Sequence, residues 1–471
     1  MSASRGETRP VQIRPRQSRL RDDARTIWRA GVEAVDSERL VGARVRAASE
    51  TLEVRGQPFE LEPGARIIAV GAGKAGAGMA AGLEAALAGS PLADRMSGWV
   101  NVPADCVRPL QRIHLHAARA PGVNEPSAAG VAGANEILRR VRQLSADDLC
   151  IVLLSGGASA LLPAPVAGIS LADKLAVTRL LMAGGATINE LNCVRKHLSA
   201  IKGGNLARAA GNARVVALII SDVIGDPLDV IGSGPTVADR STAADALAVL
   251  KQVASRRSDV PESVWALLEG KRCAPRDPPL PATVWNFVIG NNDTALSAAT
   301  AKAAEFGYAT RSLGSGNQGE ARDVGRDLAQ LIRPLRDSGA ATSGPLCVLG
   351  GGETTVRLAP TNQPRRGGRN QELVLGALDE LWDDGMRQVA VLSGGTDGED
   401  GPTDAAGAVA DADLIRTARE LGLSPEPFLA INNSYEFFER TEGLVKTGPT
   451  HTNVMDVWVA LIGSPAGSHA S

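Results

Sequence analysis

The stretch Ala69-Val-Gly-Ala-Gly-Lys-Ala-Gly-Ala-Gly-Met79 joins a short apolar run to an alanine-rich run. The apolar run 66–70 predicts a buried strand, and the alanine-rich run 79–88 predicts a helix. Glycines make the turn between them and let a ligand approach the backbone. The helix N-terminus offers N–H groups and a positive dipole end, to which the Lys74 ammonium adds a full charge. The stretch therefore predicts a phosphate or carboxylate site. The glycines expected to face that anion are Gly71, Gly73 and Gly76.

Two familiar loops can be compared with this stretch. A Walker A loop requires a glycine six residues before the lysine and Ser or Thr after it, but Ile68 and Ala75 stand there. The spacing Gly71-x-Gly73-x-x-Gly76 fits the dinucleotide fingerprint, which also requires an acidic residue about 20 positions further on. Asp94 has this spacing but is expected in a polar loop before the next strand. A tight glycine turn without a ligand is the alternative interpretation.

Length and composition indicate a soluble protein of two domains. The chain has 471 residues, of which 44% are apolar, and a net charge of −2. This charge balance predicts no nucleic-acid partner, and no apolar run is long enough to span a membrane. Five cysteines without a C-x-x-C pair favour free thiols in the cytoplasm. Residues 1–20 are polar and rich in arginine, which predicts a disordered tail rather than a secretory signal.

Strands and helices are predicted to alternate along the chain. The apolar runs 149–154 and 213–221 predict buried strands, and each runs into a glycine-bearing loop. This alternation predicts an α/β fold with a parallel sheet covered by helices on both faces. Ligands of such folds bind beyond the C-terminal ends of the strands. The pattern restarts near residue 241, and the final loop and strand at 446–462 could belong to either sheet.

A polar helix is predicted over residues 187–204. Its Asn192, Arg195, Lys196 and Ser199 have the spacing i, i+3, i+4 and i+7, which places them on one helical face. Lys202-Gly-Gly then forms the predicted C-terminal turn. An amide, a guanidinium, an ammonium and a hydroxyl on one face favour a ligand-binding surface over a merely solvated one.

Acidic residues follow two of the predicted strands. Asp397, Glu399, Asp400 and Asp404 crowd one loop, and Asp222 and Asp226 form a smaller pair. Carboxylates in such loops suit Mg²⁺, which prefers oxygen ligands, and one of them could act as a general base. Either loop could hold the metal. An Asp-Gly turn without a metal is the alternative interpretation.

The segment Gly367-Gly-Arg369-Asn-Gln-Glu372 predicts a second anion site. Arg369 stands at the start of a helix, where a guanidinium can bind phosphate or carboxylate by several bonds, and Asn370 could cap this helix. A plain cap with a surface arginine is the alternative. No nucleophile motif of the G-x-S-x-G type is present in the chain. Basic anchors, acidic loops and glycine turns without a nucleophile indicate phosphoryl transfer.

Taken together, these segments resemble the class II glycerate kinases, whose C-terminal domain is called MOFRL. The resemblance covers about residues 20–465 and rests on many motifs in the same order. They are Val70-Gly-Ala-Gly-Lys-Ala75, Ser155-Gly-Gly-Ala-Ser-Ala-Leu161, Glu190-Leu-Asn-Cys-Val-Arg-Lys-His-Leu-Ser199, Lys202-Gly-Gly204, Ser221-Asp-Val-Ile-Gly-Asp226, Gly232-Ser-Gly-Pro-Thr236, Gly351-Gly-Glu-Thr354, Gly368-Arg-Asn-Gln-Glu372, Gly395-Thr-Asp-Gly398, Thr447-Gly-Pro-Thr450 and Thr452-Asn-Val454.

The resemblance implies a fold and an activity. It implies a large Rossmann-like domain over 21–240, to which the chain end 440–471 returns, and a smaller α/β domain over 241–439 that contains MOFRL. The active site is expected in the cleft between the domains. The implied reaction is ATP-dependent, Mg²⁺-requiring phosphorylation of D-glycerate at its 2-hydroxyl. The expected partners are therefore ATP and a small hydroxy acid, and the oligomeric state, with a homodimer as one option, is left open.

The resemblance also assigns roles to residues. Lys74 and Arg369 match the family's proposed catalytic pair, and Asp222 is the expected proton acceptor, although the division of work among the aspartates stays open. The residues expected to hold the hydroxy acid are Ser155, Gly156, Gly157, Ser159, Asn192, Arg195 and Lys202. Those expected at the ATP phosphates, besides the three glycines near Lys74, are Gly352, Glu353, Thr354, Asn370 and Glu372. The expected Mg²⁺ ligands are Asp226, Asp397 and Asp404.

Two departures from the family pattern concern the acceptor. The family's His-Pro-x-Pro-Asp is replaced by Ala120-Pro-Gly-Val-Asn-Glu125, and its Thr-Gly-Thr-Asn becomes Thr450-His-Thr-Asn453. A kinase of a related hydroxy acid or ketose is therefore one alternative. An NAD(P)H-dependent hydroxypyruvate reductase and a non-enzymatic sensor of organic acids are the others.

Overall fold

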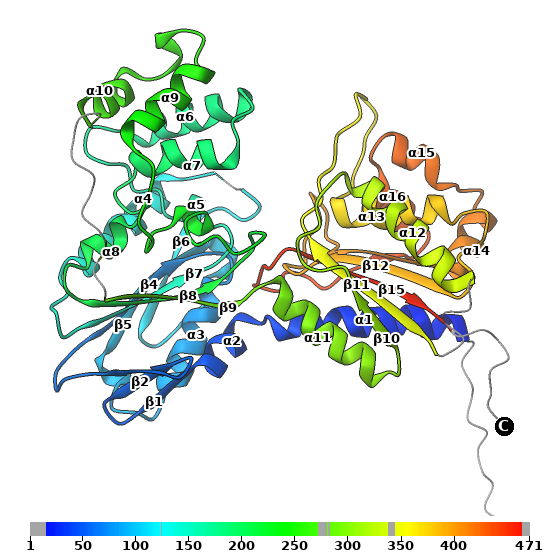
Figure 1. The fold of residues 1–471 in the computed structure, drawn as a ribbon, viewed down its shortest axis with the longest axis horizontal. Coiled ribbons are helices and arrows are strands. Elements are labelled where there is room, and N and C mark those ends of the chain that lie inside the picture. The colour runs from blue at the N-terminus through cyan, green and yellow to red at the C-terminus, as the bar shows by residue number, and fades with distance from the viewer. Residues whose placement is uncertain (1–15, 124, 272–279, 281–282, 338–343, 464–471) are drawn as a thin grey trace, which may run out of the picture. The chain divides into compact units, whose positions relative to one another are not determined.

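Two separate β-sheets organise the chain, and each belongs to its own unit. The computed structural model describes residues 16–123, 125–271, 280, 283–337 and 344–463. The described residues within 32–295 and 449–455 form one unit, called here the Lys74 unit. Those within 1–31, 296–448 and 456–471 form the other, called the Arg369 unit. Figure 1 shows both units.

The Lys74 unit is built on a six-stranded sheet in which all pairs are parallel. Its spatial order is β6-β5-β4-β7-β8-β9, which is the 3-2-1-4-5-6 order of a doubly wound, Rossmann-like fold. This confirms the predicted α/β class. The strands are β4 (Ile67–Ala72), β5 (Met96–Pro103), β6 (Ile113–Arg119), β7 (Leu149–Leu154), β8 (Arg214–Ile220) and β9 (Val284–Gly290).

Helices cover both faces of this sheet (Figure 1). The central strands β4 and β7 are buried along their whole length, as their apolar sequences require. Ile68 and Val70 of β4 share a core with Ile137 and Val141 of helix α4 (Ala128–Val141). Helix α3 (Gly76–Leu87) lies on the other face of the sheet (Figure 1). The two central strands therefore end between helices, which is where their loops can form a site.

A helical subdomain with its own core completes the Lys74 unit. Leu247 and Leu250 of α9 and Trp265 of α10 pack against Val177 of α6 and Val194 of α7. This apolar contact holds residues 243–253 and 262–271 in the Lys74 unit, and the pairing of β9 with β8 holds residues 284–290 there. The predicted boundary at residue 240 therefore differs from the observed division. The helices are α6 (Leu171–Ala183), α7 (Ile188–His197), α9 (Ala243–Val253) and α10 (Glu262–Lys271).

The Lys74 unit begins with a short helix and a small antiparallel sheet. Residues 37–44 form helix α2 (Ser37–Arg44), whose N-cap Asp36 accepts a hydrogen bond from the Arg39 N–H at 2.9 Å. This cap satisfies one of the free N–H groups at the start of the helix and so stabilises it. A three-stranded antiparallel sheet follows, made of β1 (Val45–Ala48), β2 (Thr51–Val54) and β3 (Gln57–Glu60).

The Arg369 unit contains a mixed six-stranded sheet with the order β10-β11-β15-β12-β13-β14. Only the β10–β11 pair is parallel. Strand β15 lies between β11 and β12 in the Arg369 unit, whereas residues 449–455, just before it, belong to the Lys74 unit. Its buried sequence Asp-Val-Trp-Val-Ala-Leu-Ile explains the central position. The strands are β10 (Ala309–Ser312), β11 (Leu346–Gly352), β12 (Val389–Gly395), β13 (Gly407–Asp411), β14 (Leu444–Val445) and β15 (Asp456–Ile462).

Helices lie on both faces of this second sheet as well (Figure 1). Helix α1 (Arg16–Ala34) covers one face, where Trp28 Nε1 donates to Gly394 O at 3.1 Å. The helix thus begins inside the predicted tail, because its buried Ile27 and Trp28 anchor it; residues 1–15 lie outside the described residues. Across the described residues, no helix is long and apolar enough to cross a membrane. The opposite face carries α12 (Ala321–Asp337), α13 (Arg369–Glu380), α14 (Ala412–Glu420), α15 (Pro425–Ala430) and α16 (Ser434–Arg440).

Candidate active site

The loops after β4 and β7 contact each other at the point where the strand order of the Lys74 unit reverses. The Lys74 N–H donates to Gly156 O at 2.9 Å, and the Ala75 N–H donates to Ser155 Oγ at 3.0 Å. Through this second bond the buried Ser155 hydroxyl, which belongs to the neighbouring loop, caps the start of α3. Ligands of doubly wound sheets bind at such a switch point. The two glycine-bearing loops predicted from the sequence therefore form one continuous surface.

The glycines around Lys74 are required by this contact between loops. A Cβ on Gly71 would lie 1.9 Å from Leu153 O, and one on Gly73, whose φ is +149°, would lie 1.9 Å from Ser155 Oγ. A Cβ on Gly76 would lie 2.9 Å from Val100 Cγ1. Protein atoms therefore lie where a Cβ would point at each of these glycines. The role of these three glycines at a phosphate stays a prediction.

Asp222 joins this surface from the end of β8. A Cβ on Gly156 would lie 2.2 Å from Asp222 Oδ2, and Asn453 Nδ2 donates to the same oxygen at 3.2 Å. The carboxylate is half-buried beside the backbone of the Ser155 loop. Asp226, four residues on, accepts a hydrogen bond from Asn291 Nδ2 at 2.6 Å instead. Asp222 is thus the better placed of the two for chemistry on a ligand at the switch point.

Two cations converge on Ser159, which follows the glycines of this loop. Arg195 Nη2 and Lys202 Nζ each donate to Ser159 Oγ at 2.6 Å. Lys202 also donates to Ser159 O at 3.0 Å and to Ser233 Oγ at 3.2 Å. Ser233 Oγ in turn donates to Asn192 Oδ1 at 3.1 Å. We call Ser159, Asn192, Arg195, Lys202 and Ser233 the Ser159 cluster.

Burial makes the positive charge of the Ser159 cluster costly. Only 1% of Lys202 is exposed, and burial followed by the repulsion of Arg195 lowers its pKa well below the usual value. Burial also lowers the pKa of Arg195. Lys174, which donates to Leu198 O at 3.0 Å, has its pKa lowered by burial to about 7. Among the described residues, no carboxylate bonds to any of these three side chains. Such a cluster is stabilised by a bound anion.

Helix α7 positions part of this cluster and ends earlier than predicted. It stops at His197, so Ser199 lies beyond the helix and not on its polar face. Lys196 is separated from the cluster by its ion pairs with Asp239 at 3.4 Å and Asp229 at 3.6 Å. Lys202 then approaches Ser159 from a turn that needs positive φ at the two following glycines.

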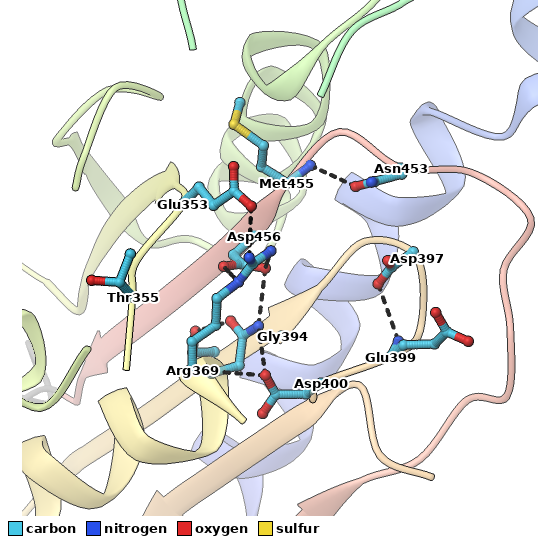
Figure 2. Close-up of polar contacts among 12 residues, drawn as sticks. Glu353, Thr355, Arg369, Gly394, Asp397, Glu399, Asp400, Asn453, Met455 and Asp456 are labelled. Carbon is cyan, nitrogen blue, oxygen red and sulfur yellow. Dashed lines mark hydrogen bonds and ion pairs between the residues drawn. The ribbon is translucent and has the colours of Figure 1, made fainter. Parts of the chain in front are cut away.

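In the Arg369 unit, two carboxylates hold the Arg369 side chain at the start of α13 (Figure 2). Its Nε donates to Asp456 Oδ2 at 2.6 Å, its Nη2 to Asp456 Oδ1 at 3.1 Å, and its Nη1 to Glu353 Oε1 at 2.7 Å. Burial alone would lower the pKa of Arg369, but Asp456 and Glu353 raise it above the usual value. A third of the side chain is exposed, so the fixed guanidinium remains accessible.

Asp400, rather than Asn370, caps helix α13. Its carboxylate accepts the N–H groups of Asn370 at 3.0 Å and Gln371 at 2.8 Å. A Cβ on the N-cap Gly368 would lie 2.2 Å from this carboxylate, so glycine is needed for the approach. Burial raises the pKa of Asp400 to about 7, although both N–H groups oppose that shift. Asn370 instead donates from Nδ2 to Asp456 Oδ1 at 2.9 Å. This bond helps to hold Asp456, which is the partner of Arg369.

The other residues predicted at the ATP phosphates have internal contacts. Gly352 has φ +148°, and a Cβ there would lie 2.1 Å from Asn317 O. Glu372 accepts hydrogen bonds from Arg322 Nε at 2.8 Å and from Asn432 Nδ2 at 3.0 Å. Thr354 is buried and Glu353 is exposed. Glu353 is therefore the member of this set that faces outward beside Arg369.

The predicted metal ligands differ in their surroundings. A Cβ on Gly395 would lie 3.0 Å from Asp397 Oδ1 and 3.5 Å from Asp456 Oδ1, so these carboxylates are neighbours (Figure 2). Asp404 is held by Lys446 Nζ at 2.8 Å and Tyr435 Oη at 2.7 Å, which lower its pKa. Within the part of the chain that the structure describes, no three His, Cys, Asp or Glu residues form a group that could hold a metal ion.

The two departures from the family pattern lie on the Lys74 unit. His451 is exposed, and its Nδ1 lies 3.5 Å from Cys106 Sγ, whose thiol also contacts Lys74 O at 3.7 Å. Glu125 forms an ion pair with Arg179, with Oε1 3.1 Å from Nη2. Asn124 lies outside the described residues. His451 thus contacts the back of the Lys74 loop through Cys106.

Comparisons with known proteins agree with this architecture. Residues 23–269 match the family model described as a domain of unknown function, DUF4147, and residues 346–456 match the MOFRL family. A glycerate kinase from Rattus norvegicus is 38% identical over 93% of this chain and 92% of its own length. An Agrobacterium vitis protein, provisionally named a hydroxypyruvate reductase, is 41% identical over 90% of this chain and 93% of its own length. The crystal structure of glycerate kinase from Thermotoga maritima, 32% identical, superposes with a TM-score of 0.80 over 94% of this chain and all of that one. The chain therefore belongs to the glycerate kinase family that carries a C-terminal MOFRL domain.

Proposed function

We propose that the protein is an ATP-dependent kinase that phosphorylates the 2-hydroxyl of D-glycerate with the help of Mg²⁺. The observation that carries the proposal is the Ser159 cluster, whose buried cations bond to no carboxylate among the described residues. Family membership supports the same reaction, because the rat and Thermotoga relatives are named glycerate kinases.

The acceptor's carboxylate is assigned to the Ser159 cluster. Arg195 and Ser159 are only partly buried, so an anion can reach them, whereas Lys202 stands behind them and adds charge. A guanidinium suits a carboxylate because it can donate two parallel hydrogen bonds. Binding an anion there also offsets the cost of the buried cations.

The acceptor's hydroxyl is assigned to Asp222. This carboxylate lies on Gly156, next to the loop that carries Lys74, and can take the hydroxyl proton onto Oδ1 or Oδ2 as the oxygen attacks phosphorus. Lys74 stabilises the charge on the transferring phosphoryl group. Phosphoryl transfer needs such positioning and electrostatic stabilisation rather than a protein nucleophile.

Arg369 and its neighbours are assigned to the nucleotide. The ion pairs with Asp456 and Glu353 keep the guanidinium charged and oriented, and its exposed part can donate to phosphate oxygens. Mg²⁺ in kinases is usually held by one or two carboxylates together with phosphate oxygens. Asp397, beside Asp456, fits that need, whereas Asp404 is neutralised by Lys446. When bound, Mg²⁺ supplies further neutralisation of the phosphates.

The reductase name of the Agrobacterium relative gives a second candidate function. An NAD site in this fold uses an acidic residue at the end of the second strand to bind the ribose. Strand β5 holds that place and reads Met-Ser-Gly-Trp-Val-Asn-Val-Pro, without an acid. Asp94 precedes β5 and pairs with Arg112. These features favour the kinase over the reductase.

An assay with two arms separates these functions. One arm follows ADP formation from ATP with D-glycerate, other three- and four-carbon hydroxy acids and short ketoses. The other follows NADH absorbance with hydroxypyruvate. The proposal expects ADP formation that depends on D-glycerate and a flat NADH trace. A higher kcat/KM for another acceptor would show that this acceptor, rather than D-glycerate, is the substrate. NADH oxidation without ADP formation would show that the protein is a reductase rather than a kinase.

A further inference from the structure

Ser233 has an unfavourable backbone conformation for a residue with a side chain. Its φ is +63°, and the glycines on either side of it, Gly232 and Gly234, have φ values of +59° and +63°. Glycine adopts this left-handed conformation without steric strain, whereas a residue with a Cβ is destabilised in it. Ser233 is completely buried, with 0% of the residue exposed. A strained, buried serine between two glycines indicates that its hydroxyl is needed at this place.

The hydroxyls of the Ser159 cluster form a chain of hydrogen bonds with a single direction. A serine hydroxyl can accept two hydrogen bonds and donate one. Ser159 Oγ accepts from Arg195 Nη2 and from Lys202 Nζ, each at 2.6 Å. Its own proton is therefore left for Ser233 Oγ at 3.1 Å. Because Ser233 Oγ also accepts from Lys202 Nζ at 3.2 Å, its proton goes to Asn192 Oδ1 at 3.1 Å.

The last bond of this chain fixes the orientation of the Asn192 amide. Since Ser233 donates, it must meet the carbonyl oxygen of the amide, and Asn192 Nδ2 is directed away from Ser233. Among the described residues, Asn192 Nδ2 has no hydrogen-bond partner, and only 4% of Asn192 is exposed. A buried amide N–H without an acceptor is costly, and a ligand oxygen removes that cost. Asn192 precedes Arg195 by three residues on helix α7, so both donors lie on one helical face.

We infer that Ser233 is a positioning residue of the acceptor site, which orients the Asn192 amide so that Nδ2 donates to the acceptor's carboxylate. Ser233 does not touch the acceptor itself, because it is completely buried. The identity of the acceptor rests on the proposed function. The chain of hydrogen bonds through Ser159, Ser233 and Asn192 does not depend on that identity.

Steady-state kinetics with D-glycerate and ATP test this role. The proteins are the wild type, Ser233→Ala, Ser233→Gly, Asn192→Ala and the double variant Ser233→Ala/Asn192→Ala. Both single Ser233 variants are expected to raise the KM for D-glycerate about tenfold, with kcat and the KM for ATP changed less than about twofold. In the Asn192→Ala background, Ser233→Ala should change the KM for D-glycerate less than about threefold, because the amide that Ser233 positions is gone.

Ser49→Gly is the matched control. Ser49 is a second serine with positive φ, +52°, and it is exposed in the turn between β1 and β2 of the same unit. Its replacement is expected to raise the thermal unfolding midpoint by about 1–3 °C and to leave the kinetics unchanged. Ser233→Gly should unfold at a higher temperature than Ser233→Ala, because glycine relieves the strain, yet both should share the raised KM. This comparison separates the backbone strain from the work of the hydroxyl.

Several results would overturn the role of Ser233. An unchanged KM for D-glycerate in folded Ser233→Ala would do so, and so would a fall in kcat alone, which is expected when a substitution only lowers the folded fraction. An equal rise in KM with and without Asn192 would show that Ser233 does not act through the amide. If Ser233→Ala loses its native circular dichroism, Ser233→Gly decides.

The proposed function can fail separately from this inference. If the wild type phosphorylates another acceptor, D-glycerate is rejected, and the same variants measured with that acceptor test Ser233. If the wild type phosphorylates no acceptor, the thermal unfolding midpoints of the wild type, the two Ala variants and the double variant decide. Non-additive shifts would support the bond between Ser233 and Asn192, and additive shifts would contradict it.

Discussion

At the scale of residues, two cations meet at one serine. Arg195 and Lys202 each donate to Ser159 Oγ at 2.6 Å, two residues after Gly157. A carboxylate bound at this serine would offset the repulsion between the two buried cations. A small hydroxy acid carries such a carboxylate on the carbon next to its hydroxyl.

Lys74→Ala should separate the chemistry of this residue from its structural contact. The Lys74 loop is held through main-chain atoms, as in the bond from Lys74 N to Gly156 O, and these survive the substitution. We expect kcat to fall about 10²–10³-fold, the effect of losing one preorganised charge contact, with an unchanged thermal unfolding midpoint. Steady-state kinetics with D-glycerate and ATP measure this. Turnover near that of the wild type in a folded variant would remove Lys74 from the mechanism.

Lys174→Met should reveal the cost of burying cations around Ser159. The pKa of Lys174 is about 7 in the folded protein against a usual value of 10.5, so the unfolded chain binds more protons between these two pH values. The stability of the wild type should therefore rise as pH increases from about 7 to 10, and the variant should lack this rise. We expect a relative gain for Lys174→Met of roughly 2–4 kcal/mol near pH 7 that disappears towards pH 10.

Urea unfolding of both proteins at several pH values between 6 and 10 measures this difference. The bond from Lys174 Nζ to Leu198 O adds an offset to every point, but it does not change the slope with pH. A stability difference that stays constant with pH would show that Lys174 is not neutralised by its burial.

At the scale of elements, the strand-to-helix turns are shaped by the neighbouring strand. The β4 turn packs on the β7 turn, and Gly71 and Gly73 lack side chains that would collide with the backbone of Leu153 and with Ser155. The sequence predicted both turns correctly because buried strands, glycines and helices follow one another locally. It could not show that Leu153 O and Ser155 Oγ lie where a Cβ on Gly71 and Gly73 would point. That contact depends on which strands become neighbours.

Gly71→Ala tests the close packing of β4 on β7. The added Cβ would lie 1.9 Å from Leu153 O, which is a main-chain atom and cannot rotate away. We expect a loss of about 3 kcal/mol or more in the free energy of unfolding. Gly42→Ala in helix α2 is the control, since nothing lies within 4 Å of its Cβ, and it should stabilise by about 0.5–1 kcal/mol. Chemical denaturation gives both values, and an equal response of the two variants would contradict the packing account.

At the scale of the whole molecule, the sequence was most informative where patterns are local and least where segments distant in the chain meet. The α/β class followed from alternating strands and helices, and Asn192 and Arg195 followed from helical spacing; the structure brings both near Ser159. Asp456 was missed as the partner of Arg369, because only strand pairing places β15 beside β11. A single acidic residue at the start of an apolar strand was the signal that could have shown it.

The domain boundaries show the same limit. Helices α9 and α10 follow residue 240, where the sequence pattern predicts the start of a second α/β series, yet their apolar faces pack on α6 and α7. Lys174 and Ser233 reach the surroundings of Ser159 from segments on either side of helix α7, so no local spacing connects them with Arg195. Packing between distant segments, rather than any motif, decides these positions.

The central claim is that this chain transfers the γ-phosphoryl group of ATP to the 2-hydroxyl of D-glycerate. Phosphorus-31 NMR of a reaction containing the purified protein, ATP, Mg²⁺ and D-glycerate tests it most directly, because the shift of the product distinguishes 2-phosphoglycerate from 3-phosphoglycerate. We expect ADP and 2-phosphoglycerate to appear in equal amounts, and no phosphoglycerate when D-glycerate is left out. A product phosphorylated at the 3-hydroxyl, or the absence of a phosphorylated product, would contradict the claim.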